Sequence, residues 1–526
     1  MKKTISLIIA VIMAFGVFSV SASAQQQIPK RSELYSIKPS EFNSAATEPA
    51  EDTELTEEDY AEIRALYNDI HTALKNRETI LDISKYAIPP DNDGCLALQT
   101  VLQAVLDNTY DLLLGKTLRY GYSSNETIIE LSFEYPDSKE LYKKHYNEAM
   151  QAIENIIADM PSGFTDLEKV LYVYNYLALN FEYDFDLYDK DKADNVVRDI
   201  YRFFTEKKGV CQAYTKAFSA IMDRLGIECY EVIDNAANHT WNVVGLNGKY
   251  YNIDTTWADP VTKTADDKYY DMTGNVSYDW FLLSDETITE SADSSSNGGH
   301  TENAFIYDNI LLGKKIECTD KTYESGYAWS NTETPLTYCE GNWYYICDYT
   351  YEDRCAKLNY TDSSFKNITN EMTFELSNWG FDNNSELIFD SCFTSLFSYG
   401  NYLCFNSNNQ ILYYDVKEQI YNILLTTFDG NNLFGCSYDG HGNITAELRN
   451  YSVIGNSIVL NSVERSAEKI YLADYCENNE RAENLVKLKK YLVTGEMDGN
   501  WGYYDVSGNI GLDIRDLIKL KKVYAQ

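Results

Sequence analysis

Apolar residues in the N-terminal part of the chain follow first a helical and then a strand period. From Glu58 they recur every three or four residues, which predicts an amphipathic helix, at Tyr60, Ile63, Leu66, Tyr67 and Ile70. The helical period returns at 96–114 and at 138–160. Between these two segments, residues 117–135 alternate around Ser123-Ser124-Asn125, which predicts a β-hairpin. The pattern therefore predicts an α/β region over residues 58–160.

A second folded segment, with mixed helices and strands, is predicted over residues 161–304. Thr165-Asp166-Leu167-Glu168 has the sequence of a capping box and opens a helix. Another helix begins near Cys211 and carries apolar residues on one face, namely Phe218, Ile221, Met222 and Leu225. Asn247-Gly248 between two alternating runs predicts a hairpin with a two-residue turn.

The remainder of the chain changes from strands to helices. In residues 305–465, short Tyr-rich runs such as Gly341-Asn342-Trp343-Tyr344-Tyr345 recur between turns rich in Asn, Asp and Gly. They predict a β-rich accessory domain of meanders, and a propeller-like arrangement is the alternative. Residues 466–526 are again helical and contain a repeat, because residues 484–490 are echoed by residues 516–522.

Length, composition and charge indicate a globular protein of several domains and argue against some binding partners. A chain of 526 residues exceeds one ordinary hydrophobic core, so several domains are expected. Hydrophobic residues make up 44% of the chain and aromatic residues 14%, which is typical of a globular protein. The net charge of −37 repels phosphate backbones and anionic lipids, so the composition argues against binding to nucleic acids or membrane surfaces.

The N-terminus has the features of a signal peptide over residues 1–24. Lys2 and Lys3 precede a short apolar run, and Ala22-Ser23-Ala24 fits a cleavage site. Residues 25–57, rich in Ser, Thr, Pro, Ala and Glu, predict a flexible linker. No later segment has the length of a transmembrane helix. We therefore expect a secreted, extracellular protein with no membrane span.

The number of cysteines leaves the disulfide state open. An exported chain usually pairs its cysteines, but eleven is an odd number, so at least one is unpaired. The spacing does not show whether the other ten form disulfides or are reduced and buried.

Three residues in the second segment suit nucleophilic catalysis. Cys211 follows Gly209 and lies at a helix N-terminus, where the helix dipole favours a thiolate. If Asn247-Gly248 is the turn, His239 and Asp254 become diagonal neighbours on one face of the hairpin. An Asp that orients an imidazole, and an imidazole that takes a thiol proton, form the nucleophile–base–orienter set of cysteine acyl transfer.

The same residues carry a family resemblance over about 160–290. Gly-Val-Cys-Gln-Ala-Tyr at 209–214, His-Thr-Trp-Asn-Val-Val at 239–244 and Tyr-Asn-Ile-Asp-Thr-Thr-Trp-Ala-Asp-Pro at 251–260 resemble the core motifs of the bacterial transglutaminase-like superfamily, a relative of the papain-like cysteine proteases. The resemblance implies an α+β papain-like core. It also implies Cys211 as nucleophile, His239 as general base and acid, and Asp254 as the group that orients His239, with no cofactor in catalysis.

A metal site of a different kind is predicted near the C-terminus. An EF-hand-type loop wraps Ca²⁺ with oxygen ligands at fixed positions. Here they would be the side chains of Asp505, Ser507, Asn509, Asp513 and Asp516 and the carbonyl of Gly511. Ile510 replaces the usual glycine of such a loop, and Asp516 replaces the usual glutamate.

The loop and the helix after it resemble a type I dockerin. The resemblance implies a cohesin domain as partner, on a scaffold protein of a cellulosome-type, polysaccharide-degrading complex. The first repeat, starting near Ala473, lacks the carboxylates, so one Ca²⁺ site is expected instead of two. A plain helical hairpin with a solvated acidic loop is the alternative.

Together these features predict a multidomain protein with an α+β catalytic core, a β-rich, Tyr-rich accessory domain and a small helical dockerin-like module. We expect a secreted cysteine-dependent acyl-transfer enzyme that acts on protein amide bonds, with peptidase or amidase activity favoured, held to a scaffold by its dockerin. The alternatives are a cross-linking transglutaminase and a non-catalytic component that binds polysaccharide through residues 305–465.

Overall fold

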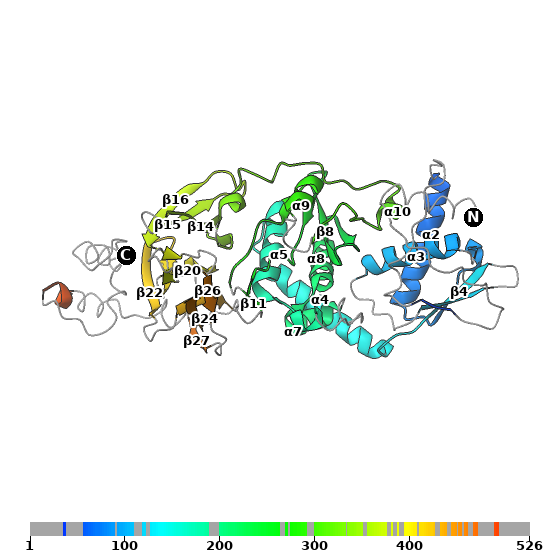
Figure 1. Cartoon of the computed structure of the whole chain (residues 1–526), viewed down its shortest axis with the longest axis horizontal. Coiled ribbons are helices and arrows are strands. Elements are labelled where there is room, and N and C mark those ends of the chain that lie inside the picture. Colours follow the sequence, from blue (N-terminus) through cyan, green and yellow to red (C-terminus); the bar gives the residue numbers. More distant parts are fainter. Residues whose placement is uncertain are drawn as a thin grey trace. The chain divides into compact units, whose positions relative to one another are not determined.

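The computed structural model describes residues 35–37, 56–89, 92–109, 118–122, 127–188, 199–263, 269–271, 274–291, 299–332, 334–350, 355–375, 380–381, 387–388, 394–407, 410–426, 432–438, 443–449, 451–454, 457–460, 466–471 and 489–493. The chain divides into two compact units (Figure 1). The first comprises Met1–Trp257 and Trp280–Thr322, and the second comprises Ala258–Asp279 and Tyr323–Gln526. The predicted signal peptide and calcium loop lie outside the described residues, and the predicted domain limits stay predictions.

The N-terminal part of the first unit packs two long helices with a small antiparallel sheet. Its elements are α2 (Glu57–Lys75), η2 (Ser84–Tyr86), α3 (Asn92–Asp107), β1 (Tyr35–Ile37), β2 (Ile80–Asp82), β3 (Leu118–Tyr122) and β4 (Ile128–Phe133), with sheet order β1-β3-β4-β2. Helix α2 begins with a capping box between Thr56 and Asp59 and buries the apolar face predicted from Glu58 onward. The predicted β3–β4 hairpin is confirmed. Tyr35–Ile37, inside the predicted linker, pair with β3.

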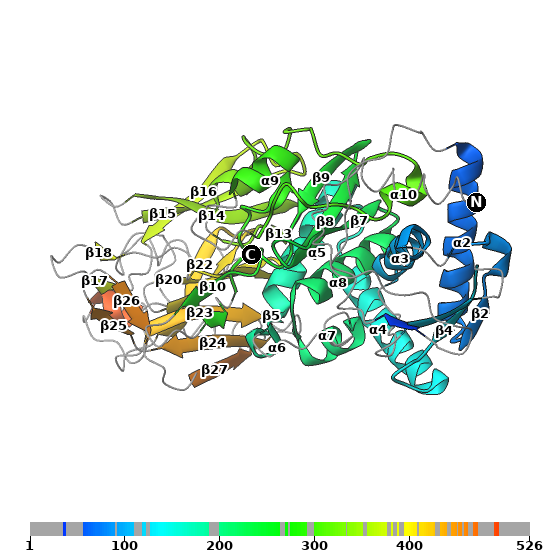
Figure 2. The ribbon, with the colours of Figure 1, turned by 45° about the vertical axis from the view of Figure 1, so that its right-hand side comes forward.

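The second part of this unit forms the α+β core. Its helices are α4 (Lys139–Asp159), α5 (Asp166–Asn180), α6 (Phe185–Tyr188), α7 (Ile200–Glu206), α8 (Cys211–Leu225), α9 (Asp285–Ser291) and α10 (Asn309–Leu312). Its strands are β5 (Glu182–Tyr183), β6 (Lys208–Gly209), β7 (Cys229–Asp234), β8 (His239–Leu246), β9 (Lys249–Ile253) and β12 (Phe281–Leu283). The last four strands form an antiparallel sheet of order β12-β9-β8-β7, and α8 packs against β7 and β8 (Figure 2).

The predicted turn fixes the register of the central hairpin. Leu246 pairs with Lys249, and the pairing continues to Asn242 and Ile253, so the predicted register is confirmed. Asn247 and Gly248 both have positive φ, at 53° and 75°. Positive φ at both central residues is what a type I′ turn requires, and Asn-Gly adopts it at low cost. The start of β8 and the end of β9 are thereby brought together.

The second unit is built mainly from antiparallel meanders, as its Tyr-rich pattern predicts. One sheet contains β13 (Thr337–Cys339), β14 (Asn342–Thr350), β15 (Cys355–Thr361) and β16 (Thr369–Glu375), and another β19 (Leu396–Tyr399), β20 (Tyr402–Ser407), β21 (Gln410–Asp415) and β22 (Ile420–Thr426). Smaller sheets contain β10 (Val261–Lys263), β11 (Tyr269–Asp271), β17 (Gly380–Phe381), β18 (Leu387–Ile388), β23 (Asn432–Tyr438), β24 (Asn443–Arg449), β25 (Tyr451–Ile454), β26 (Ser457–Leu460) and β27 (Ser466–Tyr471). A short 3-10 helix, η4, spans Ala328–Asn331. A propeller-like arrangement of these sheets stays a prediction.

Two further predictions concern membranes and cysteines. In the part of the chain that the structure describes, every helix is too short or too polar to cross a bilayer. The cysteines with described side chains are free thiols: Cys211, Cys229, Cys318, Cys339, Cys347, Cys404 and Cys436. Of the two possibilities that the sequence left open, disulfides or reduced thiols, these residues show reduced thiols.

A buried carboxyl in the first unit gives a prediction of pH-dependent stability. Burial raises the pKa of Asp308 to about 6, although a hydrogen bond from Asn108 opposes that shift. Because the folded pKa lies above the unfolded one, the protonated carboxyl stabilises the fold fully below about pH 4, and this stabilisation is lost as pH rises through 6. Asp308→Asn should therefore stabilise the protein at pH 8 by on the order of 3 kcal/mol, with no gain at pH 4. Urea unfolding at both pH values measures this, and an equal change at both would contradict it.

Candidate active site

Cys211 is the first residue of helix α8, at the positive end of the helix dipole. Val210 precedes it in an extended conformation and provides no side-chain cap. The backbone just before Cys211 is tightly packed. A Cβ on Gly209 would lie 2.6 Å from Cδ2 of Phe203 and 2.7 Å from Cβ of Ala213. The free Cys211 thiol is only partly buried. A nucleophile placed there is both supported by the helix and reachable.

The contact at Gly209 gives a direct prediction. Gly209→Ala should push α7 and α8 apart, or shift the turn before Cys211, because the added methyl has no room. We expect a loss of about 1–3 kcal/mol in the free energy of unfolding, together with slower alkylation of Cys211. Gly163→Ala is a control for the alkylation rate alone. Its φ of +92° makes a side chain costly to stability, but its Cβ would meet no atom within 4 Å, so alkylation of Cys211 should stay normal. Normal alkylation of Cys211 with unchanged stability in Gly209→Ala, or alkylation slowed equally in Gly163→Ala, would contradict the role of this contact.

His239 opens strand β8 and connects the thiol to a carboxylate. Its Nε2 lies 2.6 Å from Oδ2 of Asp254. Its imidazole also lies close enough to Cys211 for the thiol to affect the pKa of His239. Burial on its own would lower the pKa of His239, but the charge and hydrogen bond of Asp254, with a smaller contribution from Cys211, raise it to about 10. The imidazole is therefore protonated at neutral pH. It can stabilise a thiolate on Cys211 and later donate a proton.

Asp254, directly after β9, is fully buried. Its Oδ1 accepts hydrogen bonds from the backbone N–H groups of Thr256 at 2.8 Å and Trp257 at 3.2 Å. Burial favours its neutral form, but the charge of His239 and the hydrogen bonds from His239 and His300 hold the pKa of Asp254 well below its ordinary value. The group is therefore a carboxylate. The structure brings together the three residues predicted from the sequence.

A fourth residue, His300, was missed by the sequence analysis. Its Nε2 lies 2.9 Å from Oδ2 of Asp254, so the carboxylate oxygen is shared by two imidazoles. His300 follows Gly299 after a stretch of polar sequence, and no local periodicity points to it. The one available signal was scarcity, since the chain contains only five histidines and two of them lie in the predicted catalytic segment.

Two tryptophans pack around the histidines of the site. Trp241 is buried, and its Nε1 donates to Oδ1 of Asn252 at 2.9 Å. The ring of Trp257 lies 5.8 Å from that of His239 and 4.9 Å from that of His300, measured between centroids. Both indoles surround the histidines with apolar surface.

His239, Asp254 and His300 are also the described residues whose ligand atoms lie close enough to suggest a metal site. The carboxylate oxygen, however, is only 2.6 Å and 2.9 Å from the two imidazole nitrogens. These are direct hydrogen-bond distances, whereas ligands around a transition metal are separated by the ion itself. We therefore interpret the cluster as a hydrogen-bonded network.

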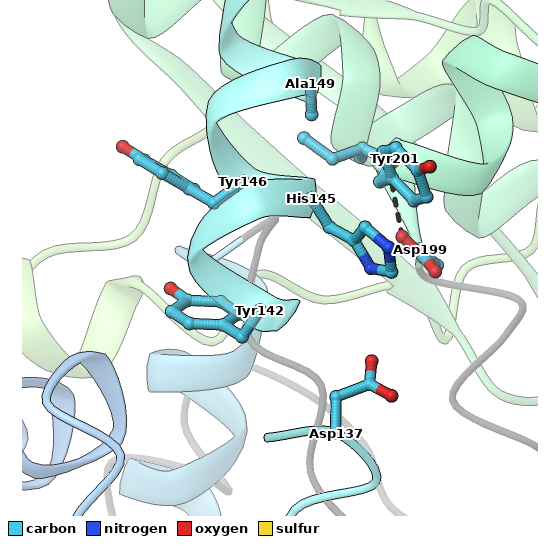
Figure 3. Close-up of a pocket in the computed structure, with 8 residues that line it drawn as sticks. Asp137, Tyr142, His145, Tyr146, Ala149, Asp199 and Tyr201 are labelled. Atoms are coloured by element: carbon cyan, nitrogen blue, oxygen red, sulfur yellow. Dashed lines mark hydrogen bonds between the residues drawn. The ribbon is translucent and has the colours of Figure 1, made fainter. Parts of the chain in front are cut away.

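A separate pocket lies between α4 and α7 (Figure 3). Its empty volume is about 290 Å³, including the open mouth, and Cys211, His239 and Asp254 are not among its lining residues. The imidazole of His145 stacks on Tyr201 there, with 3.9 Å between ring centroids. Asp199 caps α7 by accepting from the N–H groups of Tyr201 and Arg202. The pocket has no part in the chemistry proposed below.

The fold and the cluster define a cysteine–histidine–carboxylate site on an α+β core. A sequence model of the transglutaminase-like superfamily matches residues 155–255, which include Cys211, His239 and Asp254 but not His300. The chain therefore carries a transglutaminase-like domain.

Individual relatives match over short stretches. Kyphoscoliosis peptidase of Homo sapiens is 25% identical over 137 residues, which is 23% of this chain and 20% of the relative. The Mus musculus protein of the same name is 24% identical over 133 residues, 22% of this chain and 20% of the relative. The chain thus spans about a fifth of the length of these relatives. A solved structure described as a TGase aligns with 34% of this chain and 52% of its own, at 17% identity and a TM-score of 0.21.

Proposed function

We propose that the protein is a cysteine-dependent acyl-transfer enzyme acting on protein amide bonds. The observation that carries the proposal is the hydrogen bond between His239 and the buried Asp254, with Cys211 close enough to His239 to raise its pKa. A non-catalytic domain has no need of a reachable thiol, a protonated imidazole and a buried carboxylate in this order. Cys211 is the proposed nucleophile, His239 the general base and acid, and Asp254 the orienting group.

The proposed reaction proceeds in two steps. The Cys211 sulfur attacks the amide carbonyl, and the proton that it gave to His239 passes to the leaving amine as the C–N bond breaks. The product of this step is a thioester on Cys211. The N–H of Cys211, at the start of α8, would donate to the oxyanion that forms on the way. In the second step water or an amine attacks the thioester and frees the thiol.

The acceptor in the second step decides between a peptidase or amidase and a cross-linking enzyme. We favour water, because the curated relatives that match are named peptidases. The test is to incubate the enzyme with an unstructured protein, with and without a fluorescent primary amine, and to analyse the products by mass spectrometry. New peptide ends or deamidated side chains with little amine incorporation support hydrolysis. Predominant amine incorporation would assign the cross-linking activity instead, and no reaction relative to Cys211→Ala would contradict both.

We also propose that the protein is secreted. We further propose that residues 466–526 contain one Ca²⁺ site and bind a cohesin domain. The support is the signal-like N-terminus and the spacing of oxygen ligands from Asp505 to Asp516. Calorimetric titration of the full chain with Ca²⁺ should show one site that Asp505→Ala removes. The absence of binding by the unsubstituted chain, or binding that Asp505→Ala leaves intact, would contradict the site.

A further inference from the structure

His300 is a buried polar residue in an aromatic surrounding. Its ring stacks on Trp280, with 4.7 Å between centroids and 23° between planes. It meets Trp241 edge-on at 4.6 Å and Trp257 edge-on at 4.9 Å. Gly299 allows this approach, because a Cβ there would lie 2.2 Å from Cζ2 of Trp257. The three indoles and the preceding glycine fix the position of the imidazole.

A histidine in this place carries an energetic cost. Its Nδ1 is buried and has no hydrogen-bond partner among the described residues. An unsatisfied buried polar atom costs about 1–3 kcal/mol, and an apolar side chain would fill the same space without that cost. The polar contribution that His300 makes in return is the hydrogen bond from its Nε2 to Oδ2 of Asp254, 2.9 Å long.

That bond completes the coordination of the carboxylate. An ionised carboxylate has about four lone-pair directions. Here Oδ1 accepts from the backbone N–H groups of Thr256 and Trp257, while Oδ2 accepts from His239 and His300. With every direction occupied, Asp254 has one orientation, and so does the imidazole of His239 that depends on it. Without His300, Oδ2 would have a free direction and the carboxylate could rotate.

We propose that His300 is a positioning residue of the active site, which locks Asp254 so that His239 stays aligned with Cys211. This inference rests on the proposed function but extends it to a residue outside the matched range 155–255. Burial lowers the pKa of His300 against the effect of Asp254, so the ring is neutral and donates through Nε2 without adding a second cation beside His239.

The backbone around His300 supports this role. The N–H of Thr301 donates to Oδ2 of Asp234 at 2.6 Å, and Phe305 pairs with Ile233 in strand β7. Asp234 is also the strand partner of His239, and its Oδ1 accepts from the N–H groups that begin the β7–β8 turn. One aspartate therefore holds both the turn before His239 and the segment that carries His300. Asp234 therefore fixes the backbone near both imidazoles relative to the sheet.

The test compares two side chains of equal length at position 300 in the full chain. His300→Gln keeps an N–H donor close to the place of Nε2, whereas His300→Met keeps the length and loses the donor. The rate at which iodoacetamide alkylates Cys211 at pH 6 is measured on the peptide that contains it, together with the midpoint of thermal unfolding. We expect a near-normal rate for His300→Gln and a rate roughly 10- to 100-fold lower for His300→Met, a range typical of small misplacements in an active site.

The possible outcomes separate the inference from the proposed function. Normal rates in both variants, or equally slow rates in both, would overturn the role of the His300 donor. If His300→Met does not fold, His300→Phe provides a second side chain without a donor, which retains a ring between the tryptophans. His239→Ala is the reference: if it alkylates as fast as the unsubstituted protein, the proposed function fails. If His239→Ala is slow while His300→Met is normal, only the positioning role fails.

Discussion

Replacing Asp254 with asparagine should lower the rate of acyl transfer by roughly 10⁴-fold. Two backbone N–H groups, of Thr256 and Trp257, require an oxygen at the Oδ1 position. The new amide N–H₂ must therefore take the place of Oδ2, where it faces the Nε2 atoms of His239 and His300. An N–H₂ group there can only donate, so Nε2 of His239 must give up its proton. The ring then carries its proton on the nitrogen that should receive the one from Cys211.

The pH dependence should change in a defined direction in the same variant. The carboxylate of Asp254 is a main reason that the pKa of His239 lies near 10, so its removal should lower that pKa. The imidazolium that supports the thiolate would then be lost at a lower pH. The pH profile of Cys211 alkylation measures this, with circular dichroism to verify folding. Asp254→Asn with more than about a tenth of the normal activity, or with an unchanged profile, would contradict the assigned role.

A second large effect is expected at Lys216, whose side chain is only 1% exposed. It forms an ion pair with Glu231, which is 4% exposed, and donates to the carbonyl of Leu106 at 2.8 Å. Thr240, next to His239, donates to the other oxygen of Glu231 at 3.1 Å. Lys216→Met leaves the Glu231 carboxylate buried without its cation. We expect a loss of about 3–5 kcal/mol in the free energy of unfolding.

The double variant Lys216→Met with Glu231→Gln is the matched control. It removes both charges, while the Gln carbonyl can still accept from Thr240. It should therefore be clearly more stable than Lys216→Met alone, because no unpaired charge is buried. Urea unfolding of the single and double variants measures the coupling. A double variant as unstable as the single one would show that packing, rather than the buried charge, accounts for the loss.

The elements around the site were largely predictable because local rules determine them. The capping box at Thr165 and Glu168 begins α5 as expected. The Asn247-Gly248 turn sets the register that brings β8 and β9 together, and the His239–Asp254 contact follows from it. In both cases the residues that determine the helix start or the turn lie next to it in the sequence.

His300 and Lys216 could not be predicted, since each depends on contacts between distant segments. His300 is 46 residues beyond Asp254, and β10, β11, β12 and α9 lie between them in the chain. Lys216 lies on a helix whose apolar face was recognised, but lysine is almost never fully buried unless it is paired. Its partner Glu231 is on another element, so the helical pattern alone gives no sign of the pair.

The most direct test of the central claim is the rate at which iodoacetamide alkylates Cys211 below neutral pH, in the unsubstituted protein and in His239→Ala. Cys229 is an internal control, because burial raises its pKa to about 12 and it should stay unlabelled. The account predicts rapid labelling of Cys211 at pH 6, strongly slowed by His239→Ala and absent in Cys211→Ala. Labelling of Cys211 no faster than that of an ordinary thiol, with or without His239, would contradict a catalytic role for this site.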